Sequence, residues 1–195
     1  MKRLVLASTS RYRRALLERF GLPFDCISPK VDERAVVLPP RELAAALSRA
    51  KAEAVIAAAP DALIIGSDQV ATIDGEILTK PGTVARAEAQ LAQLAGRTHE
   101  LITGVCIVDA ATGERREHLD VHRITLRALT AAEIADYVAR DQPLDCGGSY
   151  KIEGLGISLM DAIEGEDFTA ITGLPMIAVR RLLGELGLGV LGRPA

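Results

Sequence analysis

Apolar residues along the chain occur in two patterns: short unbroken runs that predict buried strands, and longer runs with helical spacing. Residues 3–7, which are apolar from Leu4 onward, predict a buried strand, and residues 11–20 that follow have helical spacing. Ser10 is a candidate N-cap, because its side chain can accept a hydrogen bond from the first turn. Gly21 with Pro23 predicts the end of this helix. Further strands are predicted at residues 24–28, 62–66, 70–73, 77–78, 100–109 and 114–126, and further helices at residues 40–59, 83–94, 130–139 and 175–186.

The order of these elements predicts an α/β fold with a mixed sheet. Asp74-Gly75 is a typical hairpin signal between two short apolar runs. Residues 111–113 separate two consecutive strands, which pair antiparallel, whereas strands joined through helices pair parallel. The glycine-rich residues 145–163 are predicted to be strand-like. A chain of 195 residues suits one domain, or two lobes around one sheet, and we expect a single domain over residues 1–195.

The composition is that of a packed globular protein, with 49% hydrophobic residues and a formal net charge of -3. This charge argues against a general nucleic-acid binder, which would show a basic excess. No run reaches the roughly 20 apolar residues of a membrane span, and the apolar part of residues 1–7 is too short for a signal peptide. Three cysteines without a CxxC motif argue against a disulfide framework or a zinc site. We therefore expect a soluble, cytoplasmic protein with neither a nucleic-acid nor a membrane partner.

The first candidate for chemistry is the stretch LASTSRYRRALLERFG at residues 6–21. A strand, a hydroxyl-rich turn with Ser8 and Ser10, and a helix start form an anion site, because free backbone N–H groups and the helix dipole face one point. Arg13 and Arg14 oppose the dipole unless an anion binds there. A capped surface helix with solvated arginines is the alternative, and the residues alone leave both interpretations open.

Acidic and basic side chains elsewhere are candidates for phosphate chemistry. Asp68 follows the apolar run at 62–66, where open α/β sheets hold reactive groups, although a turn-capping role is equally common for aspartate. Asp68 and Glu33 together could supply oxygens to Mg²⁺, which takes one or two carboxylates plus substrate phosphates. Lys51 lies within a predicted helix, a setting that favours a surface lysine. Lys80 precedes a proline at a strand-to-helix junction, where a surface lysine and a phosphate-binding lysine are equally expected.

Seven motifs, occurring in order, resemble the Maf family of nucleoside-triphosphate pyrophosphatases over nearly the whole chain. They are LASTSRYRRALL at 6–17, VDE at 31–33, Lys51 in SRAKAEA, GSDQV at 66–70, TKPGT at 79–83, LAGRTHELITGV at 94–105 and GGSYKIEGLG at 147–156. The resemblance implies a long twisted mixed sheet with two α/β lobes flanking a cleft, and a homodimer.

Within this family, GSDQV and GSYKIEG resemble the branch that hydrolyses 7-methyl-GTP to 7-methyl-GMP and pyrophosphate, thereby removing modified nucleotides. The resemblance assigns substrate choice to Tyr12, Gln69 and Glu153. Physical chemistry agrees, since N7-methylated guanine is a cation that an aromatic face attracts. A carboxylate at position 153 could accept hydrogen bonds from the guanine edge, and its charge would favour the methylated base.

The resemblance also implies the catalytic roles. Asp68 would accept the proton of the attacking water or bind the metal, and the sequence does not decide between these two roles. A divalent cation (Mg²⁺, Mn²⁺ or Co²⁺) would be held by Glu33 and, in the second case, by Asp68. Ser8 and Ser10 would orient phosphate oxygens. The residues that would stabilise charge on the phosphates are Arg13, Lys51 and Lys80. Two alternatives stay open: a pyrophosphatase for canonical or other modified nucleotides such as dTTP, UTP or CTP, and a non-catalytic nucleotide-binding regulator of cell division.

Overall fold

The computed structural model describes residues 2–192. The chain divides into two compact units, unit 1 with residues 1–69, 103–120 and 167–195, and unit 2 with residues 70–102 and 121–166. Parallel and antiparallel pairs occur in the same sheet, which confirms the predicted mixed α/β class. Three long strands supply residues to both units: β3 (Ala62–Ile73), β5 (Thr98–Asp109) and β6 (Arg115–Leu126).

Unit 1 contains the N-terminal strands and three of the helices. Its sheet has the order β2-β1-β3-β5-β6, and both β2 and β3 run parallel to β1. The elements lying wholly in this unit are β1 (Arg3–Leu6), α1 (Arg11–Glu18), β2 (Asp25–Cys26), η1 (Glu33–Ala35), α2 (Pro40–Glu53), η2 (Ile56–Ala58), η4 (Phe168–Thr172) and α5 (Met176–Glu185). The predicted strand at 24–28 is therefore reduced to two residues.

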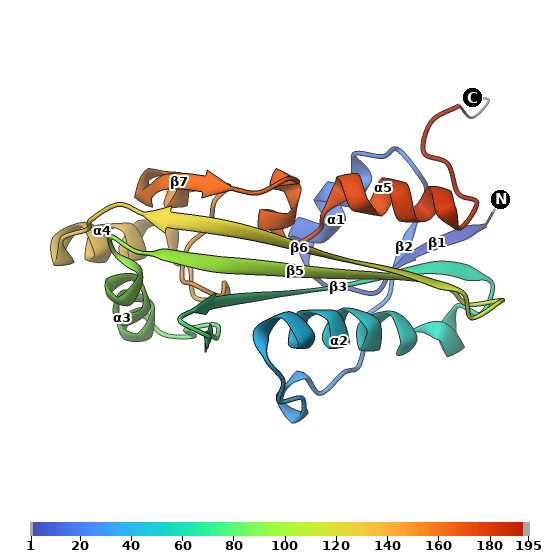
Figure 1. Ribbon diagram of the computed structural model, residues 1–195, viewed down its shortest axis with the longest axis horizontal. Helices are drawn as coiled ribbons and strands as arrows, with labels where there is room; N and C mark the ends of the chain where they lie inside the picture. Colours follow the sequence, from blue (N-terminus) through green and yellow to red (C-terminus); the bar gives the residue numbers. More distant parts are fainter. Residues whose placement is uncertain (1, 193–195) are drawn as a thin grey trace. The chain divides into compact units, whose positions relative to one another are not determined.

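Helices cover both faces of the unit 1 sheet. Leu4 and Leu6 of β1 pack with apolar residues of α1 and α5, whereas Val5 packs on the opposite face with Ala52 of α2. Successive strand side chains point to opposite faces, so an unbroken apolar run is what a strand covered on both sides requires. Figure 1 shows α1 and α5 on one side of these strands and α2 on the other.

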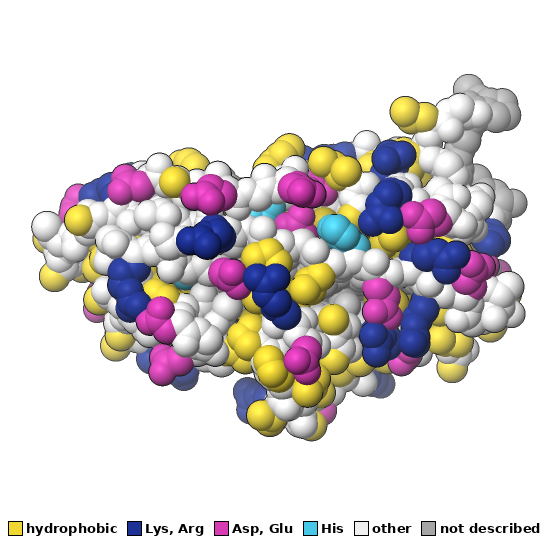
Figure 2. All heavy atoms as spheres, viewed as in Figure 1, with side chains coloured by type: hydrophobic (Ala, Val, Ile, Leu, Met, Phe, Trp, Pro, Cys, Tyr) yellow, Lys and Arg dark blue, Asp and Glu magenta, His cyan; other side chains and the backbone are white. Residues whose placement is uncertain are grey.

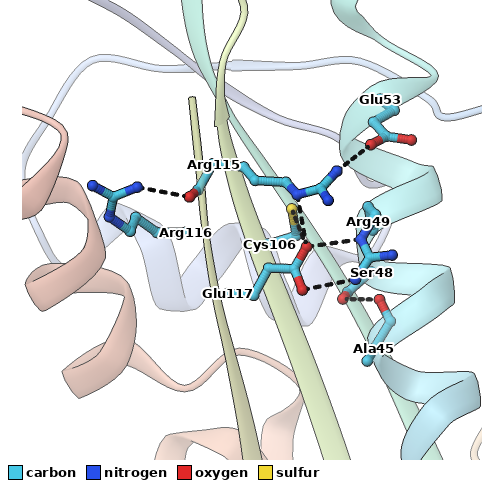
Figure 3. A network of polar contacts seen from close by, with 8 residues as sticks. All are labelled: Ala45, Ser48, Arg49, Glu53, Cys106, Arg115, Arg116 and Glu117. Atoms are coloured by element: carbon cyan, nitrogen blue, oxygen red, sulfur yellow. Dashed lines mark hydrogen bonds and ion pairs between the residues drawn. The ribbon is translucent and has the colours of Figure 1, made fainter. Parts of the chain in front are cut away.

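An ion-pair network ties α2 to β6 within unit 1 (Figure 3). The Arg49 guanidinium donates to both carboxylate oxygens of Glu117, at 2.7 and 2.9 Å. Arg115 approaches the same carboxylate at 3.4 Å and also pairs with Glu53 at 3.3 Å. Arg49 lowers the pKa of Glu117 by hydrogen bonding to its charged form. The helix α2, which carries Lys51, is thus held on the sheet by these ion pairs as well as by its apolar packing.

The prediction of a strand that ends at Gly66 is wrong. β3 continues from Ala62 to Ile73 without a break, so Asp68 lies in the middle of a strand rather than in a turn after it. The polar side chains of Ser67 and Gln69 both find partners, Gly104 for Ser67 and Thr103 for Gln69. Three consecutive polar residues have the composition of a turn, but partners on neighbouring elements allow them to be buried in a strand.

Unit 2 contains the predicted hairpin. The strand β4 (Glu76–Leu78) pairs antiparallel with the end of β3, and the turn residues Asp74 and Gly75 have φ of 52° and 83°. Two positive φ values in a two-residue loop fit the right-handed twist of paired strands. The other elements lying wholly in unit 2 are α3 (Val84–Leu94), α4 (Ala131–Asp141), η3 (Leu155–Leu159) and β7 (Met160–Glu164), which pairs antiparallel with β6.

Residues 145–163 are not the strand that their pattern predicts. They form turns and η3, and only residues from 160 onward are in β7. Gly148 and Ser149 both have positive φ, which ends any extended run. Gly156 packs so closely on the Lys151 backbone that a Cβ there would lie 2.7 Å from the Lys151 carbonyl carbon.

The described part of the chain has no helix that is both long and apolar enough to cross a membrane. Lys and Arg side chains are interspersed with Asp and Glu side chains on the face drawn in Figure 2, in keeping with a net charge of -3.

Candidate active site

The start of α1 has the hydroxyl-rich, capped turn that the sequence predicts. Ser10 caps the helix by accepting from the Arg13 backbone N–H at 3.4 Å, as predicted. The Ser8 hydroxyl oxygen in turn accepts from the Ser10 N–H at 3.1 Å. Both serines act as acceptors in these bonds, so each O–H hydrogen can still be donated to an anion. The helix dipole adds a positive potential at the same point.

Arg13 and Arg14 differ in their surroundings. Arg13 donates from Nε to the Gly173 carbonyl at 2.9 Å, and burial lowers its pKa, an effect that negative charges on Asp68 and Glu33 oppose. The remaining guanidinium nitrogens can still bind an anion. Arg14 instead pairs with Glu18 at 3.0 Å on the surface. The solvated-arginine interpretation therefore holds for Arg14 and is wrong for Arg13.

A second buried group joins this arrangement through Gly173. The Ser67 hydroxyl donates to the carbonyls of Gly104 and Gly173, both at 2.9 Å, so Gly173 accepts from Ser67 and Arg13 together. Gly173 has φ of 105°, a value that favours glycine. Sequence reasoning missed both residues. Two signals in the sequence point to them: Ser67 is a hydroxyl residue directly after an apolar run, and Gly173 directly precedes Leu-Pro.

Lys51, Asp68 and Glu33 form the centre of the site. Lys51 Nζ lies 2.5 Å from Asp68 Oδ1 and 2.7 Å from Glu33 Oε1. The side chains of Lys51 and Asp68 are 8% and 9% exposed, whereas that of Glu33 is 51% exposed. The interpretations of Lys51 as a surface lysine and of Asp68 as a turn cap are therefore both wrong.

The pKa of Asp68 is raised, because burial disfavours its charged form more than its cationic neighbours favour it. Those neighbours are Lys51 and Arg13, and the negative charge of Glu33 adds to the upward shift. A carboxylate with a raised pKa is a better proton acceptor than an ordinary aspartate. Such perturbed groups cluster at functional sites.

Glycine at two strand positions lets α2 approach the sheet closely enough to form this pair. A Cβ on Gly66 would lie 2.5 Å from the Ala52 nitrogen and 2.9 Å from its Cβ. A Cβ on Gly104 would lie 2.8 Å from the Ala44 carbonyl carbon. Ala52 follows Lys51 directly on α2, so the glycines of β3 and β5 set the distance that Lys51 must span.

Gln69 and Tyr12 are engaged with other parts of unit 1. Gln69 Nε2 lies within 3.0 Å of the carbonyls of Ala170 and Ile171. Its amide therefore holds η4 in place, a role that the sequence did not predict. The Tyr12 ring is covered by the Arg11 guanidinium, 4.8 Å from the ring centroid, and Arg11 also donates to the Tyr12 hydroxyl at 2.7 Å.

Unit 1 thus brings together most of the predicted site residues: Ser8, Ser10, Tyr12, Arg13, Glu33, Lys51, Asp68 and Gln69. Lys80 and Glu153 belong to unit 2. Lys80 is exposed in the segment between β4 and α3, and Glu153 is exposed in the loop before η3. Their part in the site remains a prediction.

The carboxylates fit a metal that arrives with a phosphate ligand. Glu33 and Asp68 each place an oxygen within 2.7 Å of Lys51 Nζ, so the two carboxylates converge, and a cation that contacts both would have to lie beside the ammonium group or displace it. Residues 2–192 contain no group of three or more His, Cys, Asp or Glu side chains arranged to hold a metal. Magnesium characteristically uses one or two carboxylates plus substrate phosphates, which is the set available here.

Together the fold and site define an α/β protein with a hydroxyl-rich, capped helix start and a buried carboxylate–lysine pair. The family described as Maf-like protein matches residues 3–186, so the chain belongs to the Maf family and the resemblance is confirmed. It is 53% identical to a 7-methyl-GTP pyrophosphatase of Xanthomonas axonopodis pv. citri (strain 306), over 96% of this chain and 98% of the relative. A protein of the same name from Aromatoleum aromaticum (strain DSM 19018 / LMG 30748 / EbN1) is 50% identical over 95% and 96%.

A solved nucleoside-triphosphatase / dITP/XTP pyrophosphatase from Mycobacterium abscessus ATCC 19977 / DSM 44196 is 16% identical, with a TM-score of 0.44 over 64% of this chain and 74% of that one. At that level the likeness supports no conclusion about function.

Proposed function

We propose that this protein is a nucleoside-triphosphate pyrophosphatase that hydrolyses 7-methyl-GTP to 7-methyl-GMP and pyrophosphate. The observation that carries the proposal is the buried Lys51–Asp68 pair beside the anion-binding start of α1. The names of the relatives at about half identity, over nearly the whole chain, supply the substrate.

Asp68 is the proposed proton acceptor. Water attacks the α-phosphorus, a new P–O bond forms, and the bond between that phosphorus and the bridging oxygen breaks to release pyrophosphate. The proton lost by the water goes to the Asp68 carboxylate, whose raised pKa suits this task. The Lys51 bond fixes the carboxylate in one orientation before the substrate arrives.

Cationic side chains stabilise the negative charge that develops on the phosphates, usually the largest contribution in phosphoryl transfer. Arg13 is held by Gly173 at its Nε, so its other nitrogens are oriented in advance. The hydroxyls of Ser8 and Ser10 donate to phosphate oxygens, and Lys80 supplies a further ammonium group. A divalent cation held by Glu33 and the substrate phosphates would supply additional charge neutralisation, which leaves Asp68 as the proton acceptor.

Base selection is proposed to rest on Tyr12, Gln69 and Glu153. The aromatic ring of Tyr12 attracts the methylated base as a cation, and Glu153 accepts hydrogen bonds from the guanine edge. Gln69 contributes its carbonyl oxygen or acts through η4, because its amide nitrogen already binds Ala170 and Ile171. Localisation in the cytoplasm and assembly as a homodimer are part of the same proposal.

A nucleotide panel tests this function. Pyrophosphate release from 7-methyl-GTP, GTP, dTTP, UTP and CTP is measured with Mg²⁺, Mn²⁺ or Co²⁺. The proposal expects kcat/KM for 7-methyl-GTP to exceed that for GTP at least about tenfold, a preference that Glu153→Gln reduces. Activity centred on dTTP and UTP would keep the reaction and overturn the assigned base, while nucleotide binding without turnover would favour a regulator.

A further inference from the structure

One side chain in unit 2 joins the loop that carries Lys80 to the loop that leads to Glu153. Gln90, on α3, accepts from the Ser149 hydroxyl at 2.5 Å and donates from Nε2 to the Thr79 carbonyl at 2.7 Å. Thr79 directly precedes Lys80, and Ser149 comes four residues before Glu153. We infer that Gln90 is a positioning residue that sets the phosphate-binding and base-reading loops relative to each other, an inference that rests on the proposed function.

The Ser149 end of this link is a conformationally unusual position. Ser149 has φ of 60° although it is not glycine, and it is fully buried. The preceding Gly148 also has positive φ, at 80°, and the Ser149 N–H bonds to the Cys146 carbonyl at 3.2 Å. A serine in the left-handed region costs free energy and persists only where its surroundings hold it. The Gln90 bond provides such a hold, because a buried hydroxyl is costly without a partner.

The two loops also contact each other directly. The Gly82 N–H donates to the Leu144 carbonyl at 3.0 Å, and a Cβ on Gly147 would lie 3.1 Å from the Leu78 carbonyl oxygen. Neither loop can therefore shift far without moving the other. The Gln90 side chain bonds to both loops.

The chain after Ser149 is fixed at the next two residues as well. The Tyr150 hydroxyl lies 2.9 Å from His99 Nε2, and the Lys151 N–H donates to the Tyr137 hydroxyl at 3.0 Å. Only one residue separates Lys151 from Glu153, so these two contacts and the Gln90 bond together fix the backbone segment that leads to the carboxylate. Gln90 thus helps to position the side chains of Lys80 and Glu153 through the loops that carry them, without itself binding the substrate.

Gln90→Leu tests this influence, because leucine has a similar volume and neither polar group. The matched control is Gln93→Leu, which makes the same chemical change on the same helix. We expect Gln90→Leu to lower kcat/KM for 7-methyl-GTP about tenfold, since displacements of about 1 Å have effects of that order or larger. We also expect the preference for 7-methyl-GTP over GTP to fall severalfold. The control should change neither quantity.

Two further variants test the bond to Thr79 and the bond to Ser149 separately. Gln90→Glu keeps an acceptor for Ser149 and loses the donor to Thr79, so the rate should fall while the base preference persists. Ser149→Gly removes the hydroxyl and tolerates positive φ, so the base preference should fall more than kcat. In a Lys80→Ala background, Gln90→Glu should lower kcat less than about twofold, because its effect acts through Lys80.

Amide hydrogen exchange of the substrate-free protein tests the positioning role of Gln90 without relying on the proposed substrate. Gln90→Leu should speed exchange in residues 79–82 and 144–151 at least about tenfold, and Gln93→Leu should not. Faster exchange in both loops without any 7-methyl-GTP turnover by the wild type would support the link and overturn the proposed function. Unchanged exchange in folded Gln90→Leu, or full additivity of Gln90→Glu with Lys80→Ala, would overturn the positioning role.

Discussion

Replacing Gly66 by alanine should separate Lys51 from Asp68 without touching either residue. The added Cβ would lie 2.5 Å from the Ala52 nitrogen and 2.9 Å from its Cβ, whereas carbon atoms pack at about 3.5–4.0 Å. Backbone atoms of α2 cannot rotate away, so the helix must move by roughly 1 Å. The Lys51–Asp68 distance of 2.5 Å would then lengthen beyond that of a good hydrogen bond.

The expected destabilisation is about 1–3 kcal/mol, the usual cost of overpacking a core. For a chain of this length each kcal/mol lowers Tm by about 2–4 °C, so Tm should fall by about 2–12 °C. The value of kcat/KM should fall by roughly 100-fold, because the catalytic carboxylate loses its fixed orientation. Thermal unfolding and pyrophosphate release at a temperature where the variant is folded measure both effects.

Gly184→Ala is the matched control on α5, where an added Cβ meets no atom within 4 Å. It should raise stability by about 0.5–1 kcal/mol through helix propensity and leave kcat/KM unchanged. If Gly66→Ala retains wild-type Tm and activity, the close approach of α2 does not set the Lys51–Asp68 geometry and the reasoning fails.

Three further predictions concern single side chains. Asp68→Asn should lower kcat by about 10²–10⁴-fold with the fold intact by circular dichroism, and a folded variant with near wild-type turnover would contradict the proton-acceptor role. Arg11→Ala should raise the kcat/KM ratio of 7-methyl-GTP to GTP about two- to fivefold, because it removes a competing cation from the Tyr12 ring; an unchanged ratio would count against Tyr12 as the base-binding ring. The Glu117 pKa is lowered in the folded state, so its pair with Arg49 stabilises the fold above the unfolded pKa and loses that effect as pH falls through the folded pKa. Glu117→Gln should therefore lower stability by about 0.5–1 kcal/mol at pH 7 and by much less at pH 3 in urea unfolding, and an equal loss at both pH values would contradict the linkage.

The sequence predicted the helix starts and the hairpin turn, which depend on interactions between residues close together in the chain. Ser10 caps α1 and Thr130 forms a capping box at the start of α4, because a hydroxyl side chain can reach the first-turn N–H groups of its own helix. The hairpin at Asp74-Gly75 likewise follows from two residues that tolerate positive φ. In each case the partners are within three residues in sequence.

The errors occurred where partners are distant in sequence. Residues 67–69 have turn composition, yet Ser67 bonds to carbonyls 37 and 106 residues away, so β3 continues through them. Lys51 has the helical setting of a surface lysine, and only its pairing with Asp68 across 17 residues explains its burial. The glycine-rich residues 145–163 are a further case, because Ser149 has positive φ and its hydroxyl bonds to Gln90, 59 residues away.

The central claim is that water attacks the α-phosphorus of 7-methyl-GTP, and isotope labelling tests it most directly. Turnover in ¹⁸O-water, followed by mass spectrometry of both products, locates the bond that is cleaved. The account predicts one ¹⁸O atom in 7-methyl-GMP and none in pyrophosphate. Label found in pyrophosphate, or release of 7-methyl-GDP and phosphate, would contradict it.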